Sequence, residues 1–277
     1  MPVRTIEATD FDYVRNLVRD HAAIVLDEGK EYLVEARLYP VARREGLGSI
    51  AELVAQLRQK PYNGLHEKVI DAMTTNETSF FRDGRPFQAL KYHLLPEFLE
   101  KRAAIKQLSI WCAASSSGQE PYTVAMLTHE FFAPYPDWTV RILASDISEE
   151  MLTRCREACY SQIEINRGLP AQYLVKYFEK RGMEWQLKEN IRRLVEFQRI
   201  NLAKRWPELP MVDIVFMRNI LIYFDTETKK KILAQTREYL RPDGYLLLGG
   251  AETTLNLDDE YEQVYFGKAS CYRQRQK

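Results

Sequence analysis

The sequence has no run of about 18 uninterrupted apolar residues, the length at which an apolar stretch predicts a membrane-spanning helix. Its first residues also lack the apolar core of a signal peptide. Positive and negative side chains balance to a formal net charge of zero, and this argues against nucleic acid, whose partners usually carry a basic surface. We therefore expect a cytoplasmic protein that neither inserts into a membrane nor binds nucleic acid.

Cysteine and histidine are scarce, with four of each in 277 residues. Cys155 and Cys159 have the spacing of neighbours on one helix face, but no nearby cysteine or histidine completes a metal site. The histidines form no H-E-x-x-H motif. We expect reduced thiols, histidines with structural or surface roles, and no bound metal.

Glycine-rich nucleotide loops are also missing. Residues 108–127, LSIWCAASSSGQEPYTVAML, predict a buried strand, a turn of small residues and a helix, the unit by which a doubly wound sheet presents a cofactor. The turn has one glycine, Gly118, and matches neither G-x-G-x-x-G nor G-x-x-x-x-G-K-[ST]. Glu120 follows it and would repel phosphates. A ligand with a positive group and no phosphate fits this turn better.

The first part of the chain shows helical spacing without a strand pattern. Ser49 and Glu52 have the spacing of a capping box, and Pro40 predicts a kink or break. The polar segment 74–85 predicts a linker between this helical part and the rest of the chain. The expected helices before and after the linker are 10–26, 31–48, 49–59, 64–74 and 86–102.

From residue 108 onward, strands and helices alternate, and this predicts a parallel sheet with helices on both faces. Residues 160–198 interrupt the alternation and predict a small insertion with a hairpin about Glu189–Asn190. A strand pair about Gly267 predicts an antiparallel edge. The expected strands are 108–112, 138–146, 195–202, 212–219 and 244–250, and the expected helices are 119–132, 148–158 and 226–240.

Ligands of open α/β sheets bind beyond the carboxyl ends of the strands. Asp146 ends the second strand, where an acidic residue accepts hydrogen bonds from the two ribose hydroxyls of a nucleoside. Both carboxylates also have structural alternatives, since Glu120 suits a helix N-terminus and Asp146 could cap the helix beginning at Ser148. Together they favour a methyl donor, S-adenosylmethionine, which carries an ammonium and a sulfonium.

Several segments together resemble the CheR family of chemotaxis receptor glutamate methyltransferases over essentially the whole chain. They are TTNETSFFRD, WCAASSSGQEPYTVAM, ILASDIS, FQRINL and FMRNILIYF. The resemblance implies an all-helical N-terminal domain (1–73), a linker that contributes to the cofactor site (74–85), and a Rossmann-like class I S-adenosylmethionine-dependent methyltransferase domain (86–277) with a small inserted antiparallel β-subdomain (about 160–198). It also implies methyl esterification of receptor glutamates, an activity of EC 2.1.1.80 type, with S-adenosylhomocysteine as product.

The resemblance further implies roles for individual residues. Arg82 and Tyr223 match residues that the family places near the transferring methyl group. The helix 31–45 offers Arg37, Arg43 and Arg44 as a basic set for the receptor's cytoplasmic helical bundle, and Arg37 and Arg43 align with arginines of the family. The alternative is a solvated helix balanced by its own glutamates. Some family members also dock a receptor C-terminal pentapeptide at the β-subdomain. The expected cofactor contacts are Asn76, Thr78, Arg82, Glu120, Asp146, Asn201, Leu202, Arg218 and Asn219.

Methyl transfer to a carboxylate needs no general base, because a glutamate with its ordinary pKa of about 4.3 is ionised near pH 7. Base methyltransferases commonly carry an Asp/Asn-Pro-Pro-Tyr/Phe turn after the fourth strand, where this chain has Arg218-Asn219-Ile220-Leu221. Two alternatives remain, a non-catalytic cofactor- or receptor-binding module and a methyltransferase for another substrate. Retention of Arg82 and Tyr223 argues against the first, and the helical domain with its Asn76–Arg82 linker argues against the second.

Overall fold

The computed structural model describes residues 6–275, which divide into two units. The first unit holds the described residues up to Thr75 together with Tyr223–Thr228, and the second holds Asn76–Ile222 and the chain from Lys229 onward. Residues 1–5 and 276–277 of the expected domains lie outside the described residues. Within the described part, no helix combines the length and the apolar character that crossing a bilayer requires.

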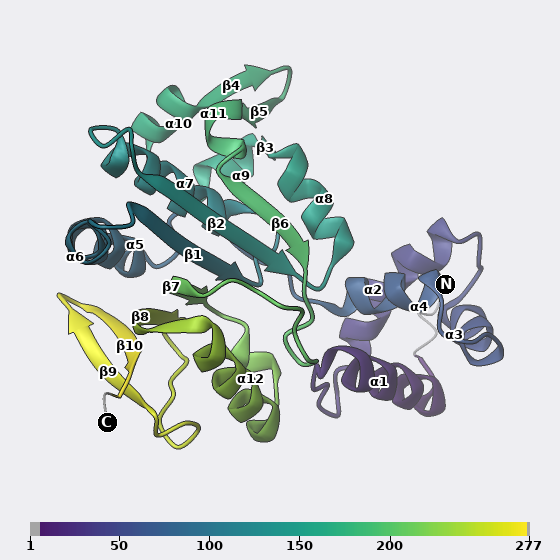
Figure 1. Cartoon of the computed structure of the whole chain (residues 1–277). Coiled ribbons are helices and arrows are strands. Elements are labelled where there is room, and N and C mark those ends of the chain that lie inside the picture. Colours follow the sequence, from purple (N-terminus) through teal and green to yellow (C-terminus); the bar gives the residue numbers. More distant parts are fainter. Residues whose placement is uncertain (1–5, 276–277) are drawn as a thin grey trace. The chain divides into compact units, whose positions relative to one another are not determined.

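The first unit is helical (Figure 1). Phe11, Val14 and Leu17 all lie on the buried side of the first helix, as their spacing predicts. The second helix runs through Pro40, so a break there is wrong; buried Leu38 and Val41 hold it on either side. The helices are α1 (Ala8–Ala22), α2 (Glu31–Arg44), α3 (Ile50–Gln59) and α4 (Gly64–Met73).

Side chains cap the last two of these helices. Ser49 Oγ accepts from the backbone N–H of Glu52 at 3.1 Å, and the Glu52 carboxylate returns to the N–H of Gly48 rather than to that of Ser49. At α4, Asn63 and His66 form a complete capping box. The capping residues expected for α3 are therefore present, with the glutamate bond displaced by one residue.

A seven-stranded sheet forms the centre of the second unit, in the order β6-β2-β1-β7-β8-β10-β9 (Figure 1). Its first five strands are parallel, and β10 and β9 continue it as an antiparallel edge. The parallel sheet with an antiparallel edge is confirmed. The strands are β1 (Gln107–Ala113), β2 (Thr139–Asp146), β6 (Val195–Arg199), β7 (Val212–Met217), β8 (Leu240–Leu248), β9 (Tyr261–Phe266) and β10 (Ala269–Gln274).

Helices follow β1, β2 and β7 and lead to the next parallel strand of the sheet. Because such crossovers are right-handed, the helices after β1 and β2 lie on one face of the sheet and the helix after β7 lies on the other. The segment expected as one long helix before β1 contains a turn of π-helix, η1. The helices are α5 (Arg85–Ala89), η1 (Leu90–Leu94), α6 (Leu95–Lys101), α7 (Gln119–Phe132), α8 (Glu149–Glu157), η2 (Leu221–Tyr223) and α12 (Thr226–Tyr239).

The insertion is a second, antiparallel sheet of order β3-β5-β4 with three short helices. Its hairpin turns at Gly182, whose φ is +61°, so a hairpin about Glu189–Asn190 is wrong; those residues open α11. Because Val195–Gln198 belong to β6, the insertion ends at Leu194. We call Cys159–Leu194 the inserted subdomain. Its elements are β3 (Cys159–Ser161), α9 (Gln162–Asn166), α10 (Ala171–Tyr177), β4 (Phe178–Arg181), β5 (Glu184–Leu187) and α11 (Glu189–Arg192).

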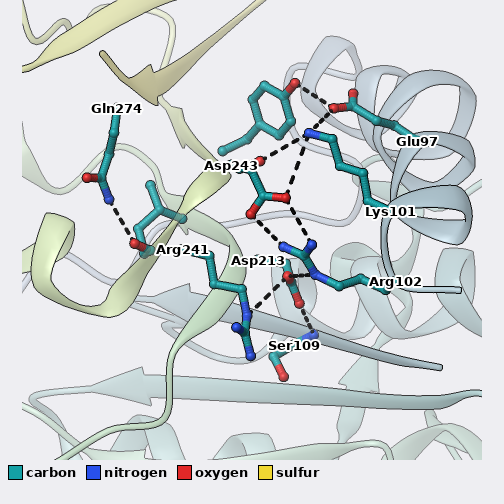
Figure 2. Close-up of polar contacts among 10 residues, drawn as sticks. Glu97, Lys101, Arg102, Ser109, Asp213, Arg241, Asp243 and Gln274 are labelled. Atoms are coloured by element: carbon teal, nitrogen blue, oxygen red, sulfur yellow. Dashed lines mark hydrogen bonds and ion pairs between the residues drawn. The ribbon is translucent and has the colours of Figure 1, made fainter. Parts of the chain in front are cut away.

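A network of charged side chains ties α6 to the sheet, toward the amino ends of β1 and β7 (Figure 2). Asp213, with a side chain only 2% exposed, accepts from Arg102 Nε at 2.7 Å and from the backbone N–H of Ser109 at 2.8 Å. Arg102 also donates from both Nη atoms to Asp243. These bonds raise the pKa of Arg102 and lower that of Asp243. The strands and the helix thus share one buried carboxylate.

We expect Asp213→Ala to destabilise the protein by about 3 kcal/mol, because removing one partner of a buried pair leaves the other charge poorly compensated. Denaturant unfolding followed by tryptophan fluorescence measures this. Glu262→Ala is the control, since Glu262 pairs with Arg273 at the surface and exposed pairs add little. Equal unfolding midpoints for the two variants would show that the Asp213 network does not stabilise the sheet.

Candidate functional site

The expected site lies at the carboxyl ends of the parallel strands. The strand order reverses between β1 and β7, and ligands of open α/β sheets bind at such a switch point. The small-residue turn follows β1, Asp146 ends β2, and Arg218 and Asn219 follow β7. The fold therefore brings these predicted positions to one edge of the sheet.

The turn after β1 has an unusual backbone that its neighbours hold in place. Ser116 and Gly118 have φ angles of +49° and +97°. A Cβ at Gly118 would lie 2.9 Å from Tyr160 Oη and 3.1 Å from Cys155 Sγ, so a side chain there does not fit. The same two atoms donate to the carbonyls of Ser117 and Ser116, each at 3.0 Å. Buried Cys155 thus supports the turn.

Cys155 lies in α8 and Cys159 lies in β3, so the two cysteines do not share a helix face. Among the described residues, no group of three or more histidine, cysteine, aspartate or glutamate side chains is arranged to hold a metal ion.

Asp146 is a buried carboxylate with oriented oxygens. Oδ2 accepts from the N–H of Ser116 at 2.8 Å, and Oδ1 accepts from that of Ser148 at 3.0 Å. Burial raises the pKa of Asp146, and these backbone bonds oppose the rise. Ser148, not Asp146, is the N-cap of α8, because its own Oγ accepts from Met151. Each Asp146 oxygen keeps acceptor capacity for a ligand hydroxyl.

Arg218 joins three parts of the second unit through a side chain that is 1% exposed. Nη1 donates to Glu120 Oε2 at 2.5 Å, and Nη2 donates to Asp83 Oδ2 at 2.6 Å and to the Arg82 carbonyl at 3.0 Å. The guanidinium also lies 5.4 Å from the ring centre of Phe87. Arg218 therefore organises the site as well as facing it.

The same cluster influences the pKa of Glu120. Burial raises the pKa of Glu120, and the nearby Arg218 guanidinium opposes this rise. Arg218 Nε is buried and has no hydrogen-bond partner within residues 6–275. A buried donor without a partner is costly and is expected to bond a ligand or a water molecule.

The linker crosses this edge of the sheet in a fixed conformation. The carbonyl of Asn76 accepts from Ser116 Oγ at 2.7 Å, and the N–H of Phe81 donates to Thr123 Oγ1 at 3.2 Å. Arg82 Nη1 donates to the carbonyl of Glu77 at 2.7 Å. The linker thus lies against the small-residue turn and α7. Thr78 is half-buried in the same segment.

Asn201 and Leu202 follow β6, the strand beside β2. The N–H of Ile200 donates to the Asp146 carbonyl at 3.0 Å, and Asn201 Oδ1 accepts from Ala203 at 3.0 Å in an Asx turn. Leu202 is buried, and its carbonyl accepts from Trp206 Nε1. Both predicted residues therefore lie next to the end of β2 that carries Asp146.

Glu252 is a residue that the sequence analysis missed. Its Oε2 accepts from the N–H groups of Asn219 and Gly249, each at 2.7 Å, and its Oε1 accepts from those of Ile220 at 2.8 Å and Leu221 at 2.7 Å. One carboxylate thus fixes the loop after β7 against the end of β8. The only sequence signal is a glutamate shortly after the glycine pair that ends a predicted strand.

Tyr223 and the three candidate receptor-binding arginines belong to the first unit. The carbonyl of Tyr223 accepts from the N–H of Val25 at 3.1 Å. Arg37 donates to the carbonyls of Met73 at 2.6 Å and Thr74 at 3.0 Å, so it holds the end of α4. Its burial lowers its pKa.

Arg43 and Arg44 are exposed at the end of α2, and Arg43 lies over the ring of Tyr39. The three arginines therefore differ in their surroundings, because only Arg37 is bound to backbone carbonyls of its own unit.

Family models match nearly the whole chain. The CheR methyltransferase all-alpha domain matches residues 9–74, and the CheR methyltransferase SAM binding domain matches residues 76–269. Chemotaxis protein methyltransferase Cher2 of Pseudomonas putida is 40% identical over 268 residues, which are 95% of this chain and 97% of that protein. Chemotaxis protein methyltransferase 1 of Vibrio cholerae is 38% identical over 276 residues, 99% of each chain. The chain therefore belongs to the CheR methyltransferase family, with an all-helical domain followed by an S-adenosylmethionine-binding methyltransferase domain.

Proposed function

We propose that this protein transfers the methyl group of S-adenosylmethionine to glutamate side chains of chemotaxis receptors and forms methyl esters. The observation that carries the proposal is the cluster around Arg218, which joins the linker, α7 and the end of β7. Relatives that match both domains are named chemotaxis protein methyltransferases. A receptor's cytoplasmic helical bundle is the corresponding partner, and the cytoplasm is the corresponding location.

The residues at the strand ends fit the cofactor, which supplies a methyl group bound to a positively charged sulfur. Asp146 suits the ribose hydroxyls, because both of its oxygens are oriented acceptors. Glu120 is paired with Arg218 through Oε2, so Oε1 can accept from the ligand's ammonium group. The buried Nε of Arg218 is a donor for a carboxylate.

The remaining predicted contacts belong to the same proposal. Asn76 and Thr78 lie in the linker, and Asn201 and Leu202 follow β6. Asn219 follows β7 and has a φ of +58°. The backbone bonds to Ser116, Ala203 and Glu252 hold three of these residues in place before any ligand binds. Preorganised contacts of this kind lose little conformational entropy on binding.

Methyl transfer requires the protein to align the acceptor carboxylate with the methyl donor, and it requires no proton transfer. An ionised glutamate is already the nucleophile, so its carboxylate must be held in line with the sulfur–methyl bond. We propose that Arg82 holds a carboxylate at the reacting centre, that of the substrate glutamate or that of the cofactor, because its guanidinium uses Nη1 for Glu77 and keeps further donors. Tyr223 is proposed as a second residue for turnover. Phe80 is fully buried and serves packing.

Receptor recognition is proposed for the exposed end of α2. Arg43 and Arg44 suit a helical bundle rich in glutamate, whereas Arg37 already binds the end of α4. A second receptor contact, with a C-terminal pentapeptide, is proposed for the inserted subdomain, because some members of the family dock one there.

Transfer of labelled methyl groups to receptor-containing membranes tests the proposed activity. The label should be released by base, as expected for a carboxyl ester. Arg82→Ala and Tyr223→Phe should reduce the transfer while the melting temperature stays near that of the wild type. Base-stable label would point to another acceptor, and an inactive wild type that still binds the cofactor would point to a non-catalytic binding module.

The affinity for S-adenosylhomocysteine should fall as the pH is lowered. Because burial raises the pKa of Asp146, its carboxyl group takes up a proton at a higher pH than an ordinary aspartate does, and it then loses acceptor capacity. Above that pKa the affinity should level off. Near neutral pH, Asp146→Asn should lose roughly 1.5–3 kcal/mol of binding free energy for S-adenosylhomocysteine, as expected for a hydrogen bond to a charged group.

Calorimetry over a pH series measures these effects. The affinity of Asp146→Asn for S-adenosylhomocysteine should depend less on pH than that of the wild type. The dependence that remains should come from Glu120, because burial also raises the pKa of Glu120. The control is Asp137→Asn, since Asp137 pairs with Lys106 at the surface. Wild-type affinity in Asp146→Asn would remove Asp146 from the site.

Charge reversal of Arg43 and Arg44 to glutamate should slow receptor methylation at low salt and flatten its salt dependence, because exposed charges mainly steer association. The affinity for S-adenosylhomocysteine should not change. Reversal of Arg15 and Arg19 on α1 gives the same change in net charge and serves as the control. Equal rates for both double variants at every salt concentration would place receptor docking elsewhere.

A further inference from the structure

The aromatic residues of the linker pack against the inserted subdomain. The Phe80 ring makes edge contacts with Tyr160 at 5.0 Å and with Phe178 at 5.7 Å between ring centres, and it is fully buried. Phe81 contacts Tyr173 at 4.9 Å. Segments that are 80 or more positions apart in sequence thus share one aromatic core, and the subdomain packs directly on the linker.

Gly168 brings the backbone of the inserted subdomain against that of the linker. A Cβ at Gly168 would lie 2.2 Å from the carbonyl oxygen of Phe80, a distance that no side chain tolerates, and its φ is +100°. Gly182 is a useful contrast in the same subdomain. It also has a left-handed φ, +61°, but no atom lies within 4 Å of its would-be Cβ. Only at Gly168 does the lack of a side chain serve contact with the linker.

A charged contact lies beside the close approach. Arg167 forms an ion pair with Glu77 of the linker. Both side chains are more than half exposed, so the pair adds little to stability. The carbonyl of Glu77, however, accepts the hydrogen bond from Arg82 Nη1. A path of direct contacts therefore runs from the inserted subdomain to Arg82.

We propose that the inserted subdomain positions the linker for cofactor binding, with Gly168 and Phe80 as the positioning residues. This role is separate from any docking of a receptor segment on the subdomain. It rests on the proposed placement of Asn76, Thr78 and Arg82 in the cofactor site. A shift of the Phe80 carbonyl moves the backbone between these residues, because all of them lie within seven positions of the linker.

Gly168→Ala and Gly182→Ala in the full-length chain form a matched test. Both variants place alanine at a left-handed position, so both should lower the melting temperature, and Gly168→Ala should lower it more because its Cβ would also meet the Phe80 carbonyl. Only Gly168→Ala forces the Phe80 carbonyl to move. It should bind S-adenosylhomocysteine on the order of 10- to 100-fold more weakly, the scale expected for misplacing a binding group by about 1 Å, while Gly182→Ala binds like the wild type.

Calorimetry gives the affinity, and the two melting temperatures show whether stability alone explains any loss. The proposal is overturned if Gly168→Ala folds and binds S-adenosylhomocysteine like the wild type, or if Gly182→Ala loses as much affinity. Because this readout needs no receptor, it stays decisive even if wild-type protein methylates no receptor and the proposed function fails.

A charge exchange gives a second test if Gly168→Ala does not fold. Arg167→Glu sets two carboxylates against each other and should weaken S-adenosylhomocysteine binding several-fold, since like charges repel at this spacing. The double variant Arg167→Glu, Glu77→Arg restores an opposite pair and should recover the affinity. Equal affinities in the wild type, the single variant and the double variant would overturn the positioning role.

Discussion

The site depends on one buried guanidinium, that of Arg218. A charge held at 1% exposure must be paired and hydrogen-bonded to be tolerated, and the chain meets this need with Glu120, Asp83 and the Arg82 carbonyl. These partners come from the start of α7 and the linker, while Arg218 itself follows β7. Satisfying one charge therefore fixes three elements around the switch point of the sheet, which is where a cofactor can bind.

The linker is held from both of its sides by different kinds of interaction. Hydrogen bonds to Arg218, after β7, and to Thr123 in α7 hold the linker on one side. On the other side, Phe80 packs into the inserted subdomain against Gly168. Glu252 holds the loop after β7 in a similar way, because its single carboxylate accepts hydrogen bonds from several backbone N–H groups. Segments without regular structure become rigid here because neighbouring side chains satisfy their backbone groups.

Strand ends were predictable from the sequence because an apolar run that stops at a polar residue marks them directly. Asp146 and Arg218 were placed in this way, and both lie at the expected edge. The hairpin at Glu189–Asn190 was misplaced because a polar pair also suits the first turn of a helix, and the true turn at Gly182 carried a weaker signal. Glu252 escaped notice because its partners are backbone groups, which leave no pattern in the residue types.

The sequence by itself determined the alternation of strands and helices, the helical character of the first unit and the carboxylates at successive strand ends, since each follows from local periodicity and from the residue where a run stops. Only the tertiary structure decided which charges meet. Arg218 and Glu120 are 98 positions apart, and Arg167 and Glu77 are 90 apart. Such pairs form because the crossovers of the sheet and the packing of the insertion bring them together, and no local rule encodes a contact over that distance.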